Sequence, residues 1–290
     1  MSASLLIRGI GVLAELIVTD GALGPEQDAL LADELRRVWA RCLVNPVTLR
    51  PDEAPETTVR LQLTNDAEPT ASTLDQAFAA NTLDEPQPDD EYTVVAHDIE
   101  ALLTSATQTI TRALLARRIG RRLLLHAGCV AHPVTGKALA FAAAGGTGKT
   151  TLTIGLSKRY SYVTDETLCV NADGDVAPYP KPLSVVGAGR YYKAERSPDE
   201  LGLASIGAEP LLVGLVLLHR DPEATDVTVE DLPLLTAIEE LVPQSSSIHR
   251  LPEPLHAVAN VIDLVDGVQR WTYSEWETLE PLVEARLGTV

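Results

Sequence analysis

The chain has 290 residues, enough for one large domain or two smaller ones that each bury a core. Its 41 acidic residues outnumber its 23 lysines and arginines, so the formal net charge is −18 and the overall field disfavours nucleic acid and anionic membranes as partners. Three cysteines without C-x-x-C spacing, no basic N-terminal leader and no apolar run of 18 residues predict a cytoplasmic protein with reduced thiols.

The first part of the chain, residues 1–97, is predicted to form a small α+β module. Residues 5–18 favour one or two strands, and residues 25–43 place apolar side chains at helical spacing. Residues 57–63 alternate between apolar and polar side chains, as a half-buried strand does. Residues 65–91 are rich in Asp, Glu, Pro and Thr and predict a solvated acidic loop.

The second part, residues 98–290, is predicted to form a separate α/β domain. Apolar patterning predicts a series of elements in it: a helix at 99–119, strands at 122–131, 138–144, 160–170 and 211–218, helices at 234–241 and 254–266, and a last helix after Ser274. The sequence shows no internal repeat.

A glycine-rich turn follows the strand at 138–144 and opens a helix at Lys149, which matches the Walker A pattern G-x-x-x-x-G-K-[ST] except for Ala143 at the first glycine. Backbone N–H groups of such a turn, with the positive end of the helix, bind phosphate groups. Lys149 is expected to reach the β- and γ-phosphates, and the hydroxyl of Thr150 to hold Mg²⁺. The predicted nucleotide-binding residues of this loop are Ala144, Gly145, Gly146, Thr147, Gly148, Lys149, Thr150 and Thr151.

Two carboxylates, Asp165 and Glu166, interrupt the apolar strand at 160–170. Acidic side chains at the end of a strand beside a Walker A loop are suited to reach its Mg²⁺. A histidine, His126, lies in the apolar run of the strand at 122–131. Such a histidine is either a core residue with its hydrogen bonds satisfied or a functional group, and the strand alone leaves both open.

The order and spacing of His126, the glycine-rich turn and Asp165-Glu166 resemble the nucleotide-binding core of the phosphoenolpyruvate carboxykinase/HPr kinase superfamily, over roughly residues 123–183. The total length and the separate N-terminal module are more similar to the HPr serine kinase branch. The resemblance implies a P-loop kinase domain with a mixed sheet flanked by helices. The N-terminal module would then supply a surface for the acceptor or a partner.

The resemblance also implies residue roles. Lys149 matches the phosphate-binding lysine and Thr150 the hydroxyl ligand of Mg²⁺. Asp165 is either a metal ligand or the base that accepts a proton, and in the second alignment Glu166 is left to the metal. His126 matches a histidine that coordinates a second metal in carboxykinases and lies beside the reacting phosphate in the kinases.

Two further residues are weaker matches to the family. Lys181 falls where carboxykinases have another lysine that contacts phosphate, and Arg190 is a candidate for a cation that stabilises the transition state, with a plain surface arginine as its alternative. The glycine-rich signature segment of HPr kinases and the arginine-rich oxaloacetate site of carboxykinases are both missing from the sequence. Neither HPr nor oxaloacetate is therefore expected as a substrate.

The expected function is transfer of the γ-phosphate of ATP, with Mg²⁺ or alternatively Mn²⁺, to a serine-like hydroxyl on a peptide, a protein or a small molecule. Two alternatives stay open: a nucleotide-binding regulatory or scaffold protein with lost catalysis, and an ATPase accessory protein. A homo-oligomer is compatible with the sequence. Positioning, metal charge and one base suffice for phosphoryl transfer, so the predicted residue set is chemically complete.

Overall fold

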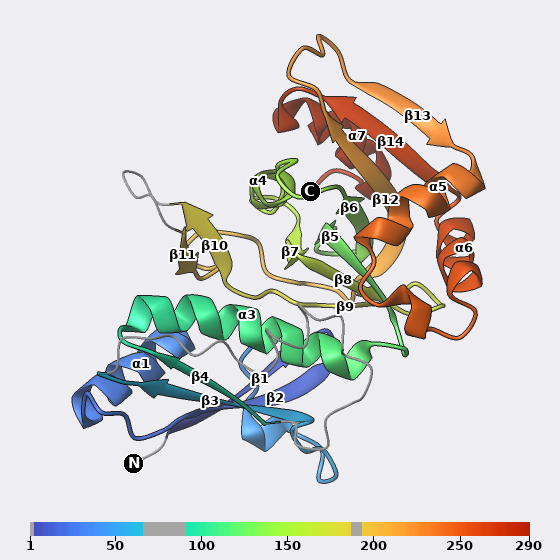
Figure 1. The fold of residues 1–290 in the computed structure, drawn as a ribbon. Coiled ribbons are helices and arrows are strands. Elements are labelled where there is room, and N and C mark those ends of the chain that lie inside the picture. The colour runs from blue at the N-terminus through green and yellow to red at the C-terminus, as the bar shows by residue number, and fades with distance from the viewer. Residues whose placement is uncertain (1–2, 66–90, 187–192) are drawn as a thin grey trace. The chain divides into compact units, whose positions relative to one another are not determined.

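The computed structural model describes residues 3–65, 91–186 and 193–290, and contacts within the chain divide it into two compact units (Figure 1). The first unit comprises Met1–Arg117 and Lys181–Glu200, and the second comprises Arg118–Pro180 and Leu201–Val290. This division differs from the boundary predicted at residue 97, because the next helix and a later hairpin both belong with the first unit. Most of the predicted acidic loop lies outside the described residues.

The first unit contains a four-stranded sheet in the order β1-β2-β3-β4. Its strands are β1 (Ala3–Gly9), β2 (Val12–Val18), β3 (Thr57–Leu63) and β4 (Glu91–Ala96). The β1–β2 pair is antiparallel and the other two pairs are parallel. Along β3, buried residues alternate with half-buried ones, so one face of the sheet is packed and the other is partly exposed.

Two helices complete this part of the first unit. Helix α1 (Pro25–Val38) begins with proline at its first position, which needs no N–H donor there, and buries Leu31, Leu35 and Val38. Helix α3 (Ile99–Arg118) runs alongside the sheet (Figure 1) and buries apolar residues along its whole length, including Leu103, Ile110 and Leu114. Contacts within the chain group nearly all of this helix with the sheet before it rather than with the strands that follow.

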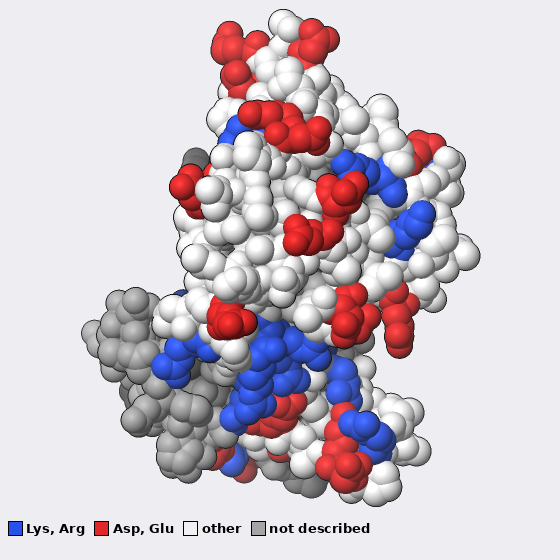
Figure 2. Space-filling model, turned by 90° about the vertical axis from the view of Figure 1, so that its right-hand side faces the viewer, with Lys and Arg blue, Asp and Glu red and all other residues white. Residues whose placement is uncertain are grey.

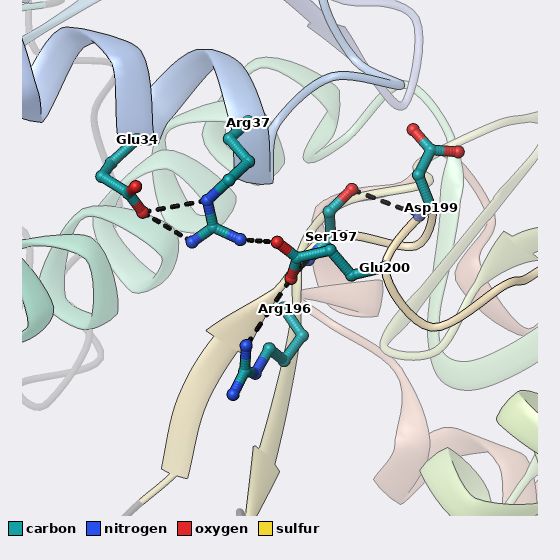
Figure 3. A network of polar contacts seen from close by, with 6 residues as sticks. All are labelled: Glu34, Arg37, Arg196, Ser197, Asp199 and Glu200. Carbon is teal, nitrogen blue, oxygen red and sulfur yellow. Dashed lines mark hydrogen bonds and ion pairs between the residues drawn. The ribbon is translucent and has the colours of Figure 1, made fainter.

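A hairpin from much later in the sequence also belongs to the first unit. Its strands are β10 (Leu183–Val186) and β11 (Lys193–Arg196), paired antiparallel. The chain after β11 is tied to α1 by an ion pair between Glu200 and Arg37, which also binds Glu34 (Figure 3). Asp199 pairs at 2.8 Å with Arg41, which lies in the turn after α1. Because exposed ion pairs each contribute only about 0–1 kcal/mol, their main effect is to orient the segment.

The second unit is built on an eight-stranded mixed sheet in the order β13-β14-β12-β6-β5-β8-β9, with β7 also paired to β5. Its strands are β5 (Leu123–Ala131), β6 (Lys137–Ala142), β7 (Ser161–Thr164), β8 (Thr167–Val170), β9 (Val176–Ala177), β12 (Leu211–Arg220), β13 (Thr228–Leu232) and β14 (Val268–Tyr273). The strands β6, β12 and β14 run parallel, whereas β5 is antiparallel to its neighbours β6, β7 and β8.

Helices cover both faces of this sheet. On one face, α5 (Leu234–Leu241) and α6 (Pro254–Leu264) pack on one apolar core, and on the other, α4 (Lys149–Leu156) and α7 (Glu280–Leu287) pack on a second. Side chains alternate between the two faces of β6, so this strand contributes to both cores. Its residues in the first core are Ala138, Ala140 and Ala142, and those in the second are Leu139 and Phe141. The predicted α/β fold with a mixed sheet flanked by helices is confirmed.

The structure bears on two expectations drawn from composition, which are that nucleic acid and membranes are disfavoured as partners. Figure 2 shows one large group and several smaller groups of Lys and Arg side chains on the face drawn, while Asp and Glu form several separate groups. A net acidic chain therefore still carries local basic surface. Among the helices within the described ranges, none combines the length and the apolar character needed to cross a bilayer.

The turn between β5 and β6 depends on one glycine. Gly136 has a φ of 72°, and a Cβ built on it would overlap the carbonyl oxygen of Glu209. We expect Gly136→Ala to lower the free energy of unfolding by about 2–5 kcal/mol, because the left-handed conformation costs about 1–2 kcal/mol and displacing packed neighbours about 1–3 kcal/mol. Denaturant unfolding measures the loss.

Gly267→Ala is the matched control. Gly267 has a φ of 96°, but no described atom beyond its own chain neighbours lies within 4 Å of the added Cβ. Its loss should therefore stay at the backbone cost of about 1–2 kcal/mol. Equal losses in the two variants would show that the Glu209 contact contributes nothing.

Candidate functional site

The glycine-rich turn, named here the glycine loop (residues 143–148), connects β6 to α4 in the second unit. Gly146 and Gly148 have φ values of 82° and 95°, a conformation that glycine adopts without the strain of a side chain. A Cβ added at Gly145 would meet no described atom within 4 Å apart from its chain neighbours, so the loop is open on that side. The hydroxyl of Thr147 donates to the carbonyl oxygen of Ala144 at 2.7 Å and closes the turn.

Lys149, the first residue of α4, is buried, with 6% of its surface exposed. Its Nζ donates to the carbonyl oxygens of Ala143 at 2.5 Å and Ala144 at 3.2 Å, so the ammonium group lies across the start of the glycine loop. Burial lowers the pKa of Lys149. The cation is therefore held at the loop by hydrogen bonds to carbonyl groups.

Asp165 follows the end of β7 and is also buried, with 7% of its surface exposed. One carboxylate oxygen, Oδ2, accepts a hydrogen bond from the hydroxyl of Thr150 at 3.3 Å. The other, Oδ1, accepts one from the phenol of Tyr162 at 2.9 Å. Thr150 and Asp165 thus lie side by side. The first is the predicted hydroxyl ligand of Mg²⁺, and the second is the first residue of the predicted acidic pair.

His126 lies on β5, and Glu166 lies in the bend between β7 and β8. His126 is opposite Thr167 in the β5–β8 pair, and the backbone N–H of Ala127 donates to the carbonyl oxygen of Glu166 at 3.1 Å. His126 is exposed while its neighbours on β5 are buried, which removes the interpretation of it as a core histidine. Desolvation lowers the pKa of His126 and the charge of Lys149 adds to this, whereas Glu166 and Asp165 act in the opposite direction.

Two contacts hold this region together: one is a hydrogen bond from a tyrosine, and the other is a close approach that a glycine permits. The phenol of Tyr273, at the end of β14, donates to the carbonyl oxygen of Thr147 at 3.2 Å, and burial raises the pKa of Tyr273. Gly128 on β5 lets α4 approach closely, because an added Cβ would overlap the hydroxyl of Thr153. Neither Tyr162 nor Tyr273 was predicted from the sequence. Tyr273 is 126 residues away from Thr147 in the chain. Tyr162 is close to Asp165 in the chain, but strand alternation would place the two side chains on opposite faces.

Thr151 is exposed on the first turn of α4. Lys181 belongs to the first compact unit, whereas the glycine loop belongs to the second; Lys181 is 3% exposed, and its Nζ donates to the carbonyl oxygen of Pro182 at 3.0 Å. Arg190 lies outside the described residues. The residues that come together are therefore His126, Lys149, Thr150, Asp165 and Glu166.

The donor set at Thr150 and Asp165 suits a divalent cation that prefers oxygen ligands. Mg²⁺ binds oxygen at about 2.0–2.1 Å in octahedral geometry, so two adjacent ligands lie about 3 Å apart. The Thr150 hydroxyl and Asp165 Oδ2 are 3.3 Å apart, close to that spacing. Both residues therefore fit the predicted metal site, with Glu166 next in the chain.

The second unit is, by its fold and site, an α/β unit in which a glycine-rich loop joins a central strand to a helix beside a buried aspartate. No protein-family model matches the chain, and a search of curated proteins found no significant match. The functional argument consequently depends on the residues themselves.

Proposed function

We propose that the chain is an ATP-dependent phosphotransferase of the HPr kinase/phosphoenolpyruvate carboxykinase type, which transfers the γ-phosphate to a hydroxyl group. The observation that carries the proposal is the grouping of Lys149, Thr150 and Asp165 around one glycine loop, with Thr150 Oγ1 3.3 Å from Asp165 Oδ2. Loop, cation, hydroxyl and carboxylate are the parts that P-loop phosphoryl transfer uses.

Each residue has a chemical task in this proposal. The backbone N–H groups of the glycine loop and the ammonium of Lys149 bind phosphate oxygens, exchanging the contacts of Nζ with the Ala143 and Ala144 carbonyl groups for contacts with anions. The Thr150 hydroxyl and Asp165 Oδ2 hold Mg²⁺. When bound, Mg²⁺ neutralises charge that develops on the phosphate oxygens.

The transfer itself forms a bond between the acceptor oxygen and the γ-phosphorus and breaks the bond to the β-phosphate oxygen, which leaves with ADP. The acceptor hydroxyl loses a proton in this step, and Asp165 receives it if its carboxylate is the base rather than a metal ligand. His126 is exposed on β5, and the charges of Lys149 and Asp165 both act on its pKa. In this proposal, the task of His126 is to contact the transferring group.

A second function is a nucleotide-binding regulatory or scaffold protein that has lost catalysis. The observation that favours it is Ala143, which is 3% exposed and stands where the Walker A pattern has glycine. An accessory ATPase, which hydrolyses ATP without an acceptor, is a third. The three functions share the nucleotide site and differ only in what happens to the γ-phosphate.

The test follows the γ-phosphate. The purified full chain is incubated with Mg²⁺ and ATP that carries a label on the γ-phosphate, alone and with a panel of serine-containing peptides and small alcohols. A phosphotransferase places the label on an acceptor, and an ATPase releases it as inorganic phosphate. Lys149→Ala protein, purified in the same way, corrects for contaminating ATPases.

Label on an acceptor, lost in Lys149→Ala, supports the proposal. Release of inorganic phosphate alone, equally dependent on Lys149, assigns the chain to the ATPases. Binding of Mg-ATP without turnover assigns it to the regulatory or scaffold proteins.

A further inference from the structure

Tyr162 contacts Asp165 from within the core of the second unit. Its side chain is 0% exposed, and its phenol donates to Asp165 Oδ1 at 2.9 Å. A hydrogen bond to an ionised group is shorter and stronger than one between neutral groups. The phenol therefore fixes the rotation of the carboxylate and leaves Oδ2 directed at Thr150.

The backbone between Tyr162 and Asp165 departs from a regular strand. In an unbroken strand, positions 162 and 165 face opposite sides, because side chains alternate with a period of two. The β5–β7 pairing shifts register between Cys129 and Val130: Thr164 is opposite Cys129, but Tyr162 is opposite Val130. Asp165 then follows the end of β7 in a bend, and its carboxylate meets the phenol of Tyr162.

The backbone around Tyr162 is fixed on both edges. On one edge β7 pairs with β5, and on the other the N–H of Tyr162 donates to the carbonyl oxygen of Ala204 at 3.0 Å. One residue later, the carbonyl oxygen of Val163 accepts from the N–H of Tyr179 at 2.9 Å. The position of the phenol is therefore set by the sheet and not by a mobile loop.

We propose that Tyr162 is a positioning residue for the metal site: it holds Oδ1 of Asp165 so that Oδ2 and the Thr150 hydroxyl present a ready pair of oxygen ligands to Mg²⁺. This inference rests on the proposed nucleotide-binding function. A ligand carboxylate whose second oxygen is already hydrogen-bonded loses less rotational freedom when the cation binds. Removing such a partner typically costs 10–100-fold in metal affinity or activity.

Tyr162→Phe removes only the hydroxyl and keeps the ring in the core. In the full chain, it should raise the Mg²⁺ concentration needed for half-maximal ATP binding by about 10-fold or more. Binding of ATP in the absence of divalent cations should stay as in wild type, because no phosphate contact is removed. Titration calorimetry of ATP over a series of Mg²⁺ concentrations measures both quantities without requiring turnover.

Tyr160→Phe is the matched control. Tyr160 is 2% exposed and its phenol also donates a hydrogen bond, but to the carbonyl oxygen of Gly288 at 3.0 Å. The same atom is lost two positions away, so a general effect of removing a buried hydroxyl appears in both variants. Only Tyr162→Phe should change the dependence on Mg²⁺.

A double variant distinguishes positioning of Asp165 from a general loss of stability. In an Asp165→Asn background, Tyr162→Phe should have little further effect on the Mg²⁺ dependence, because the group that it positions has lost its charge. Additive effects, an unchanged Mg²⁺ dependence in Tyr162→Phe, or an equal loss of metal-free ATP binding would each overturn the inference while wild-type binding stands. Wild-type protein that binds no ATP, or binds it without regard to Mg²⁺ or Lys149, would overturn the proposed function as well.

Discussion

Turnover by the Asp165→Asn protein is expected to fall by about 10²–10⁴, the range typical of losing a general base, with nucleotide still bound. Asparagine has nearly the shape of aspartate and can still accept a hydrogen bond from Tyr162, so the fold should be retained. It cannot accept a proton from the acceptor hydroxyl or offer a charged oxygen to Mg²⁺. Rate measurements at saturating ATP report the change.

The Mg²⁺ dependence of nucleotide binding separates the two roles of Asp165. If Asp165 is the base, ATP affinity stays near wild type at every Mg²⁺ concentration. If it is a metal ligand, Mg²⁺-dependent binding weakens, and excess Mg²⁺ partly restores it. Asp173→Asn, on an exposed turn of the same unit, is the control for loss of one negative charge. Full activity of folded Asp165→Asn protein would reject both roles and favour the scaffold function.

Lys149→Ala should abolish most of the stabilisation by Mg-ATP. At 100 times its dissociation constant, a ligand adds about 2.7 kcal/mol to the free energy of unfolding. For a unit of this size, that corresponds to roughly 5–10 °C in Tm. Alanine removes the one ammonium group that already lies at the glycine loop, so the phosphates would lose their principal cationic contact. Thermal unfolding with and without Mg-ATP measures the shift.

Each variant must be compared with itself, since removing a buried lysine bonded to two carbonyl groups also changes the stability of the free protein. Lys137→Ala provides the control: it removes an exposed lysine at the other end of β6 and should leave the shift intact. An undiminished shift in Lys149→Ala would place the nucleotide site elsewhere in the chain.

The glycine loop and the acidic pair could be predicted because their signals are local. A strand, a glycine turn and a helix follow one another within residues 138–159, and the structure has β6, the glycine loop and α4 there. Asp165 and Glu166 interrupt an apolar run, and they lie between β7 and β8. Neither signal requires knowledge of which strands pair.

The supporting residues could not be found in that way. Alternation predicts that Tyr162 and Asp165 face opposite sides, whereas the register shift of β7 and the bend after it are visible only in the structure. Strand β14 was missed because its buried residues, Val268, Trp271 and Tyr273, are spaced by three and then two positions. Strand β13 is an edge strand that is exposed over all but its last residue, so it lacks an apolar pattern.

The boundary between the two parts was predicted at residue 97. The division by contacts instead groups nearly all of α3 with the strands before it. Lys181 was assigned by resemblance to the nucleotide site and belongs to that same first unit. Its role in phosphate binding stays a prediction, as does that of Arg190.

The return of Lys181–Glu200 to the first unit has a consequence for biosynthesis. Chains emerge from the ribosome N-terminus first and domains tend to fold as units as they appear. The first 117 residues emerge without the segment that supplies Glu200 to Arg37 of α1 and Asp199 to Arg41 in the turn after it. The first unit therefore waits for its last segment until the glycine loop and the acidic pair have been synthesised, and a fragment that stops at residue 117 is an unfinished unit rather than a module.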